Sequence, residues 1–150
     1  MFRRADLSCL RCHAISQAGG QIGPDLSAVG ANSPVDYLIN SVYDPDAQIK
    51  ESFISRVVLT TDGLTLQGIV VDRTDDKLVL KDADGRLHEI PRDDIDDEIA
   101  GKSLMPKGLV KFMTRSEIVD LAAFLSRLGR PGPYAVRSSP RMQRWRLLQN

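Results

Sequence analysis

Cysteine and histidine are scarce in this sequence. The 150 residues include only two cysteines, Cys9 and Cys12, and only two histidines, His13 and His88. No cysteine is left over for a disulfide between distant parts of the chain, and a Cys9–Cys12 disulfide would close only a very short loop. A zinc site would need two ligands besides the cysteines, and His13 and His88 are the only histidines, so the sequence argues against zinc.

The sequence also lacks an excess of charge of either sign and a long apolar run. Lysine plus arginine and aspartate plus glutamate number 20 each, so the chain has no overall field that would favour nucleic acid or an anionic membrane. No apolar run approaches the roughly 20 residues of a transmembrane helix. A hydrophobic content of 42% with 27% charged residues is ordinary for a globular domain.

The most informative stretch that the chain does contain is Cys9-Leu10-Arg11-Cys12-His13. It reads C-x-x-C-H, which is the attachment signature of a c-type haem. Each cysteine sulfur can add to a haem vinyl group, and the histidine directly after the second sulfur can ligate the iron. A C-x-x-C alone would leave zinc, a redox dithiol and haem open, and the adjacent His13 favours haem.

Haem of this type is normally attached outside the cytoplasm, yet no signal peptide precedes the motif, because Met1-Phe2-Arg3-Arg4 leads straight into it. We therefore expect a periplasmic or other extracytoplasmic location, with this chain as a piece of a longer exported protein.

The chain after the motif alternates between loop, helix and strand patterns. A Gly-rich loop leads to Pro24, whose carbonyl could accept a hydrogen bond from Nδ1–H of His13. Ser33-Pro34 is expected to open a helix that ends at Asp44-Pro45, and Thr114 to Glu117 is a capping box that opens a last helix ended by Gly129. The stretch over 93–98 is expected as helical turn or loop.

Between these helices, residues 53–97 have the alternation and turn signals of short antiparallel strands, which predicts a small SH3-like β subdomain. We expect it to be a separable insertion with a structural role; partner docking and shielding of a haem edge are the alternatives. His88 is expected to be a surface or packed histidine rather than a ligand. Residues 131–150 are interpreted as a basic linker or tail, with a nucleic-acid patch as the alternative.

A sixth ligand to haem iron would come from a methionine. Met105 fits best, because Pro106 restricts its backbone to the extended region and the loop lies just before the last helix. Soft thioether sulfur raises the reduction potential of haem iron and fills its open site, which favours electron transfer over oxygen chemistry. The alternatives are that Met105 is a gap-filling core residue and that Met113 is a plain core contact.

Taken together, the pattern resembles a class I cytochrome c and, more narrowly, the planctomycete-type haem-binding domain. The similar phrases cover roughly residues 2–130: Cys9–His13, Ile22-Gly23-Pro24-Asp25-Leu26, Tyr43-Asp44-Pro45, Thr61-Asp62-Gly63 and Ser103-Leu104-Met105-Pro106-Lys107-Gly108-Leu109. The spacing from His13 to Met105 is long for the family, and the β-rich stretch accounts for the excess.

The resemblance implies a mainly α cytochrome c fold with an inserted antiparallel β subdomain, α+β overall. The haem domain would be discontinuous, over 1–52 and 98–130, around the insertion over 53–97. One covalent haem c would be held by Cys9, Cys12 and His13, with iron ligated by His13 and Met105. Its pocket would also include Ile22, Pro24, Leu26, Leu38 and Leu104.

Three functions follow as hypotheses. The first is single-electron transfer to or from a redox partner or a fused dehydrogenase. The second is a haem-based sensor in which a small gas displaces Met105. The third is an interaction module without haem, in which the β insertion and basic tail bind a partner. No acid–base or nucleophile constellation occurs, so we do not expect an enzyme, and neither nucleic acid nor a membrane span is expected.

Overall fold

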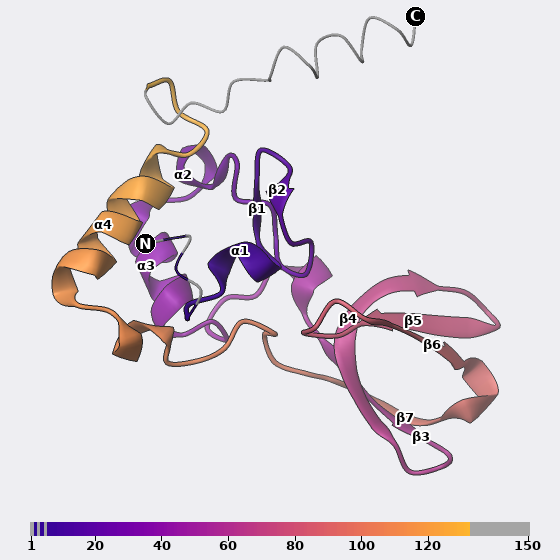
Figure 1. Cartoon of the computed structure of the whole chain (residues 1–150). Coiled ribbons are helices and arrows are strands. Elements are labelled where there is room, and N and C mark those ends of the chain that lie inside the picture. The colour runs from indigo at the N-terminus through magenta and orange to yellow at the C-terminus, as the bar shows by residue number, and fades with distance from the viewer. Residues whose placement is uncertain (1, 3, 5, 133–150) are drawn as a thin grey trace, which may run out of the picture.

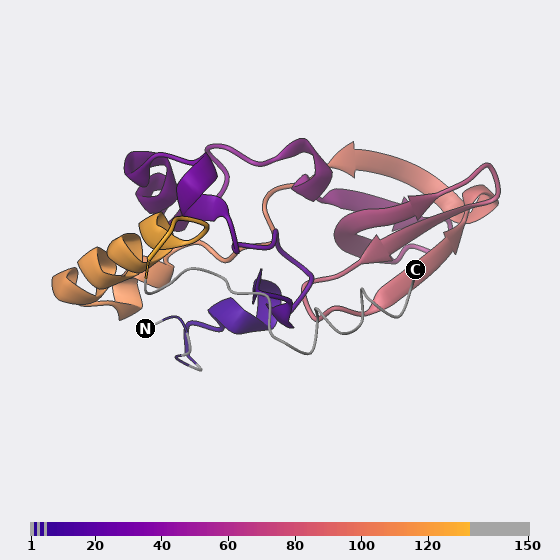
Figure 2. The same ribbon diagram turned by 90° about the horizontal axis from the view of Figure 1, so that it is seen from above.

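The structure, a computed structural model, describes residues 2, 4 and 6–132. Met1, Met142 and nearly all of the expected basic tail over 131–150 therefore lie outside the described residues. The described part has a helical region at one end and a curled sheet at the other (Figures 1 and 2).

Four α-helices form the helical region. They are α1 (Cys9–Cys12), α2 (Val29–Asn32), α3 (Val35–Tyr43) and α4 (Arg115–Arg127). Short 3₁₀ turns η1 (Glu51–Phe53), η2 (Arg92–Asp94) and η3 (Leu109–Phe112) join later parts of the chain. Leu38 on α3 and the leucines of the last helix and its end form one buried cluster: Leu38, Leu121, Leu125 and Leu128. This cluster holds α3 against α4, so the two longer helices form one wall of the helical region.

The helix ends follow the sequence signals closely. In α4 the Thr114 hydroxyl accepts from the Glu117 N–H while the Glu117 carboxylate accepts from the Thr114 N–H, so the predicted capping box is confirmed. The middle helix α3 ends at Asp44 as predicted, but Pro34 takes the N-cap position that was expected for Ser33. Helix boundaries commonly shift by one residue in this way.

The β elements are β1 (Ala14–Ile15), β2 (Ala18–Gly19), β3 (Arg56–Thr60), β4 (Thr65–Arg73), β5 (Lys77–Lys81), β6 (Leu87–Pro91) and β7 (Ile95–Ala100). The first two form a tiny hairpin, and the other five form one antiparallel sheet in the order β6-β5-β4-β3-β7. The sheet has its own apolar centre of Val58, Leu78, Leu80 and Ile90, separate from the helical cluster. Burial alternates at the end of β3, but three consecutive residues of β5, Leu78, Val79 and Leu80, are all buried.

The expectation of a mainly α fold is wrong, because the described residues form seven strands in two antiparallel sheets and only four α-helices, two of them a single turn long. The Gly-rich loop after His13 contains the β1–β2 hairpin, where a plain loop was expected. The acidic stretch over 93–98 was expected as turn or loop, but β7 begins at Ile95 and pairs with β3. Acidic side chains can occupy this edge strand because Asp96 and Asp97 are exposed, whereas Glu98 is paired with Arg73.

Polar contacts at two places join the sheet to the rest of the chain. The β5–β6 turn approaches the C-x-x-C-H motif, where the Arg11 guanidinium lies 2.7 Å from the Asp84 carboxylate. At the base of the sheet, the first and last chain segments run together: the Gly101 N–H donates to the Ser55 carbonyl at 2.8 Å. The fully buried Ser55 hydroxyl donates to the Lys102 carbonyl at 2.5 Å. The sheet is thus fixed at its base and docked at one turn.

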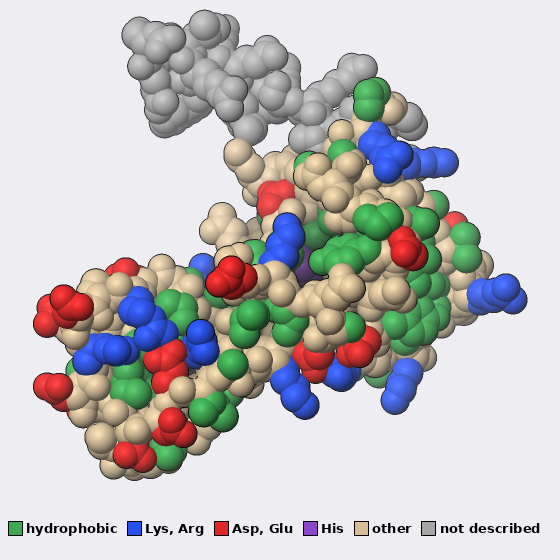
Figure 3. Space-filling model, turned by 180° about the vertical axis from the view of Figure 1, so that it is seen from behind, with side chains coloured by type: hydrophobic (Ala, Val, Ile, Leu, Met, Phe, Trp, Pro, Cys, Tyr) green, Lys and Arg blue, Asp and Glu red, His purple; other side chains and the backbone are tan. Residues whose placement is uncertain are grey.

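The outer surfaces of the two regions differ in chemistry. Hydrophobic side chains gather over the helical region, whereas acidic and basic side chains are mixed over the sheet (Figure 3). Of the helices in the described ranges, none is both long and apolar enough to cross a bilayer.

Candidate functional site

The single turn of α1 presents the two cysteines. Cys9 and Cys12 are three residues apart, which places both sulfurs on one face of the helix. Both are free thiols and partly buried, and this burial raises the pKa of each thiol. Both side chains are therefore protonated at neutral pH, the state in which a thiol adds to a double bond only with assistance.

The loop after the motif folds back over it through backbone hydrogen bonds. The Gly23 N–H donates to the Cys12 carbonyl at 2.8 Å, and the Leu26 N–H donates to the Ala14 carbonyl at 2.8 Å. The reversal depends on Ser16 and Gln17, whose φ values of 52° and 65° are those of a tight primed hairpin turn. The chain thus folds back so that Gly23 and the residues after it lie beside His13.

His13 is held in one orientation by this loop. Its Nδ1 lies 2.8 Å from the Pro24 carbonyl oxygen. A carbonyl only accepts, so Nδ1 carries the proton and Nε2 keeps its lone pair in the neutral ring. Burial lowers the pKa of His13, which favours that neutral form. The hydrogen bond of His13 to a described residue uses Nδ1, which leaves Nε2 available as a ligand.

Gly23 allows the loop to lie directly against the imidazole. A Cβ at this position would lie 2.6 Å from His13 Cε1 and 2.8 Å from Nδ1, both closer than carbon atoms approach in real structures. Only glycine therefore fits between the Cys12 carbonyl, to which its N–H is bonded, and the histidine ring.

A cavity of about 290 Å³ opens in front of the motif. Cofactor pockets typically enclose about 300–1,000 Å³, so the cavity is of the size that holds a small molecule. Its lining includes all nine residues that the sequence suggested for a haem pocket. From the motif and its loop come Cys9, Cys12, His13, Ile22, Pro24 and Leu26. From the middle helix and the later loop come Leu38, Leu104 and Met105.

Met105 reaches the cavity on a short loop that other residues hold in place. Its N–H donates to the Ser103 hydroxyl at 3.1 Å, and the Ser103 N–H donates in turn to the Asp46 carboxylate at 2.9 Å. Met113 also lines the cavity, and it packs against the buried leucine cluster as well. Two thioethers thus face the same space, one from a loop and one from the edge of the core.

Sequence reasoning missed several wall residues. On α3 the cavity is lined by Tyr37, Ser41 and Val42 in addition to the expected Leu38. The Ser41 hydroxyl donates to the Tyr37 carbonyl at 2.8 Å, so this hydroxyl does not face the apolar space unpaired. Helical spacing could have identified this face.

The β sheet also contributes to the wall, through Ile69 of β4, and Phe53 of the preceding turn lies beside it. Ile69 is 9% exposed. Strand alternation shows that such a residue is buried but not what it is buried against, so no sequence signal marked Ile69 as part of a pocket.

His88 lies on β6, where its Nε2 is 2.7 Å from the Asp82 carboxylate, and it is not among the residues that line the cavity. That His88 is a surface or packed histidine rather than a ligand stays a prediction.

The donor set suits a c-type haem better than a bare metal ion. Within residues 2, 4 and 6–132, no three histidine, cysteine, aspartate or glutamate side chains are grouped to hold a metal ion. Haem iron needs only two axial donors from the protein, and here an imidazole nitrogen and two candidate thioethers face one apolar cavity. The two thiols beside His13 add the covalent attachment points. These residues therefore fit a haem.

No protein-family model matches the chain, and no curated protein matches it significantly.

Proposed function

We propose that this chain is a c-type haem domain that transfers single electrons. The observation that carries the proposal is the convergence of Cys9, Cys12, His13 and Met105 on one cavity, although Met105 is distant from the motif in the sequence. The resemblance of the C-x-x-C-H, Gly-Pro and Met-Pro phrases to the planctomycete-type haem-binding domain supports the same function. The proposal concerns the haem site and does not depend on a mainly α fold.

Cys9 and Cys12 would attach the haem. Each thiol would add across one haem vinyl group to form a thioether, its sulfur on one carbon and its hydrogen on the other, with no leaving group and no oxidant. The raised pKa of both thiols keeps them protonated, so we expect attachment to depend on a haem c maturation system.

His13 would ligate the iron through Nε2. The Pro24 carbonyl fixes the ring by accepting from Nδ1–H, and this hydrogen bond also makes the distal ring nitrogen a better donor to iron. Gly23 permits this arrangement, because any side chain there would strike the ring.

Met105 would ligate the iron from its hydrogen-bonded loop. A haem held by His13 and Met105 would supply one-electron oxidation and reduction at a raised potential. Apolar side chains of the cavity wall, among them Leu38 and Leu104, would lie around it. Such a site favours electron transfer over ligand binding.

The proposed partners are a redox protein or a fused dehydrogenase domain, and the proposed location is extracytoplasmic. Both follow from haem c chemistry and from the resemblance.

The proposal is tested by replacing each of the two candidate methionines, Met105 and Met113, in turn in haem-loaded protein. Ferric haem with a thioether ligand has a weak near-infrared band and stays low-spin. Met105→Ala should remove the band, lower the potential and admit added ligands, whereas Met113→Ala should change stability only, by roughly 2–5 kcal/mol.

Wild type should also titrate as a single one-electron couple and fail to bind carbon monoxide when reduced. Loss of the band in Met113→Ala but not in Met105→Ala would refute the proposed ligand. Ready binding of carbon monoxide by wild type would favour the gas sensor instead, and a chain without haem would favour the interaction module.

A further inference from the structure

One carboxylate holds both ends of the loop that carries Met105. Asp46 Oδ1 accepts from the Ser103 N–H at 2.9 Å, and its Oδ2 lies 2.9 Å from the Lys107 ammonium. Met105 and Pro106 lie between these two points. Asp46 therefore fixes the start of the loop through its backbone and the end through a side chain.

Asp46 is itself fixed. It follows Pro45, which is buried and lines the cavity, in a turn closed by the Ala47 N–H donating to the Asp44 carbonyl at 3.1 Å. Its side chain is only 18% exposed, although Lys107 is 59% exposed. A turn that is part of the cavity wall thus presents a shielded carboxylate to the methionine loop.

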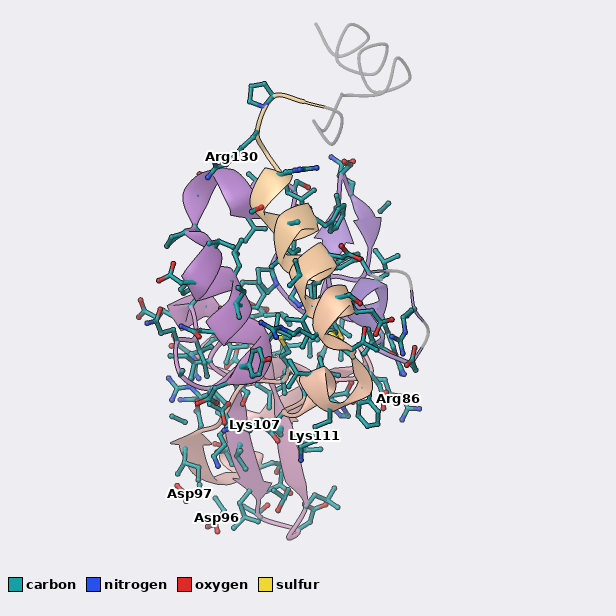
Figure 4. All side chains as sticks on the ribbon, turned by 90° about the vertical axis from the view of Figure 1, so that its left-hand side faces the viewer. Arg86, Asp96, Asp97, Lys107, Lys111 and Arg130 are labelled. Carbon is teal, nitrogen blue, oxygen red and sulfur yellow. The ribbon has the colours of Figure 1, made fainter. Side chains whose placement is uncertain are left out.

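The connection continues inward to the methionine. The Ser103 hydroxyl accepts from the Met105 N–H at 3.1 Å, so two hydrogen bonds lead from Asp46 to the backbone of Met105. On the other side of Ser103, the Lys102 carbonyl accepts from the buried Ser55 hydroxyl. The base of the sheet and the Asp46 turn together leave the loop little freedom. Figure 4 shows Lys107 at the level where the helices give way to the sheet.

Asp44 offers a natural comparison. It also contacts the Lys107 ammonium, at 3.1 Å, but its side chain is 56% exposed and no described hydrogen bond joins it to Ser103. Exposed ion pairs contribute little, whereas a charge-assisted bond to a partly buried N–H contributes more. The two aspartates therefore share a partner and differ in the contact that reaches the methionine loop.

We propose that Asp46 is a positioning residue that keeps Met105 directed into the cavity and so resists its replacement by other ligands. This inference rests on the proposed haem function. Asp46 does not touch the iron in this account; it acts through Ser103 and Lys107.

The experiment uses haem-loaded protein and imidazole as the competing ligand, with loss of the near-infrared band as the signal. In Asp46→Ala, imidazole should displace the native ligand at a concentration about tenfold lower than in wild type, the factor that corresponds to one charge-assisted hydrogen bond. Asp46→Asn keeps an oxygen that can accept from Ser103 and should restore part of the resistance. Asp44→Asn should stay within about twofold of wild type, the range of an exposed ion pair.

Amide hydrogen exchange gives a second readout. The Ser103 and Met105 N–H groups should exchange about tenfold faster in Asp46→Ala than in Asp44→Asn, while amides of β4 should be unchanged. Should Asp46→Ala fail to fold, Ser103→Ala removes only the acceptor of the Met105 N–H and should itself weaken the resistance to imidazole.

Equal imidazole sensitivity in the Asp46 and Asp44 variants would overturn the inference while leaving the haem function intact. A wild-type protein without haem, or without the band, would overturn the proposed function and the inference with it.

Discussion

Replacing Gly23 by alanine should displace the His13 ring. The new methyl group would lie 2.6 Å from Cε1, 2.8 Å from Nδ1 and 3.2 Å from Nε2 of the imidazole. Moving the backbone instead would break the bond from the Gly23 N–H to the Cys12 carbonyl. The ring is thus the part that must shift, and its hydrogen bond to Pro24 would be lost.

The magnitude follows from these contacts. Overpacking costs about 1–3 kcal/mol, and the lost hydrogen bond adds about 0.5–1.5 kcal/mol. Restricting the unfolded chain returns about 0.4–1 kcal/mol. We therefore expect Gly23→Ala to lower the free energy of unfolding by about 0.5–4 kcal/mol, measured by urea unfolding.

Gly63→Ala is the matched control. Gly63 lies in the β3–β4 turn with φ of 85°, and no atom lies within 4 Å of the place that an added methyl group would take. Alanine there therefore costs only backbone strain of about 1–2 kcal/mol. Both variants should lose stability, but only Gly23→Ala should alter the haem spectrum and weaken retention of the iron ligand, because only it disturbs His13. A Gly23→Ala protein with the stability and spectrum of wild type would refute this account of the loop.

Three further predictions concern the remaining structure. Six of the described carboxylates have a lowered pKa because hydrogen bonds favour their ionised form. The unfolded chain therefore binds more protons as the pH falls, and the stability present above about pH 4–5 should be lost progressively below it. Equal free energies of unfolding in denaturant titrations at pH 7 and pH 3.5 would contradict this. Residues 56–100 can be replaced by a short Gly/Ser linker, because Ser55 and Gly101 are hydrogen-bonded neighbours. This variant should keep covalent haem but bind imidazole more readily, because Ile69 no longer lines the cavity. Unchanged imidazole affinity would show that the sheet does not shape the pocket. Thr114→Ala should cost about 1 kcal/mol in thermal or urea unfolding through loss of the capping box without changing the spectrum, and a spectral change would contradict a purely local role.

The helix ends and turns could be predicted because each has a short-range physical cause. The capping box at Thr114 and Glu117, the helix end at Asp44 and the β turns depend on neighbours in the chain. The nine pocket residues came from motif spacing and resemblance, and the cavity brings them together. Whether they hold haem stays a prediction.

The predicted mainly α fold was wrong because the order of the helix signals along the chain does not indicate how long each helix is. The helix signals were real, but α1 and α2 are single turns, whereas the β-branched stretch forms a five-stranded sheet. The role of Ile69 and the clamp at Asp46 depend on contacts between segments far apart in the chain. Hydrophobic periodicity and secondary-structure propensity contain no information about such long-range contacts.

The measurement that tests the central claim most directly is the intact mass of denatured protein made in a host with a haem c maturation system. Wild type should retain the mass of one haem after denaturation, and the Cys9→Ala/Cys12→Ala double variant should retain none. A wild-type chain that carries no covalent haem, or a double variant that still carries it, would contradict the proposal.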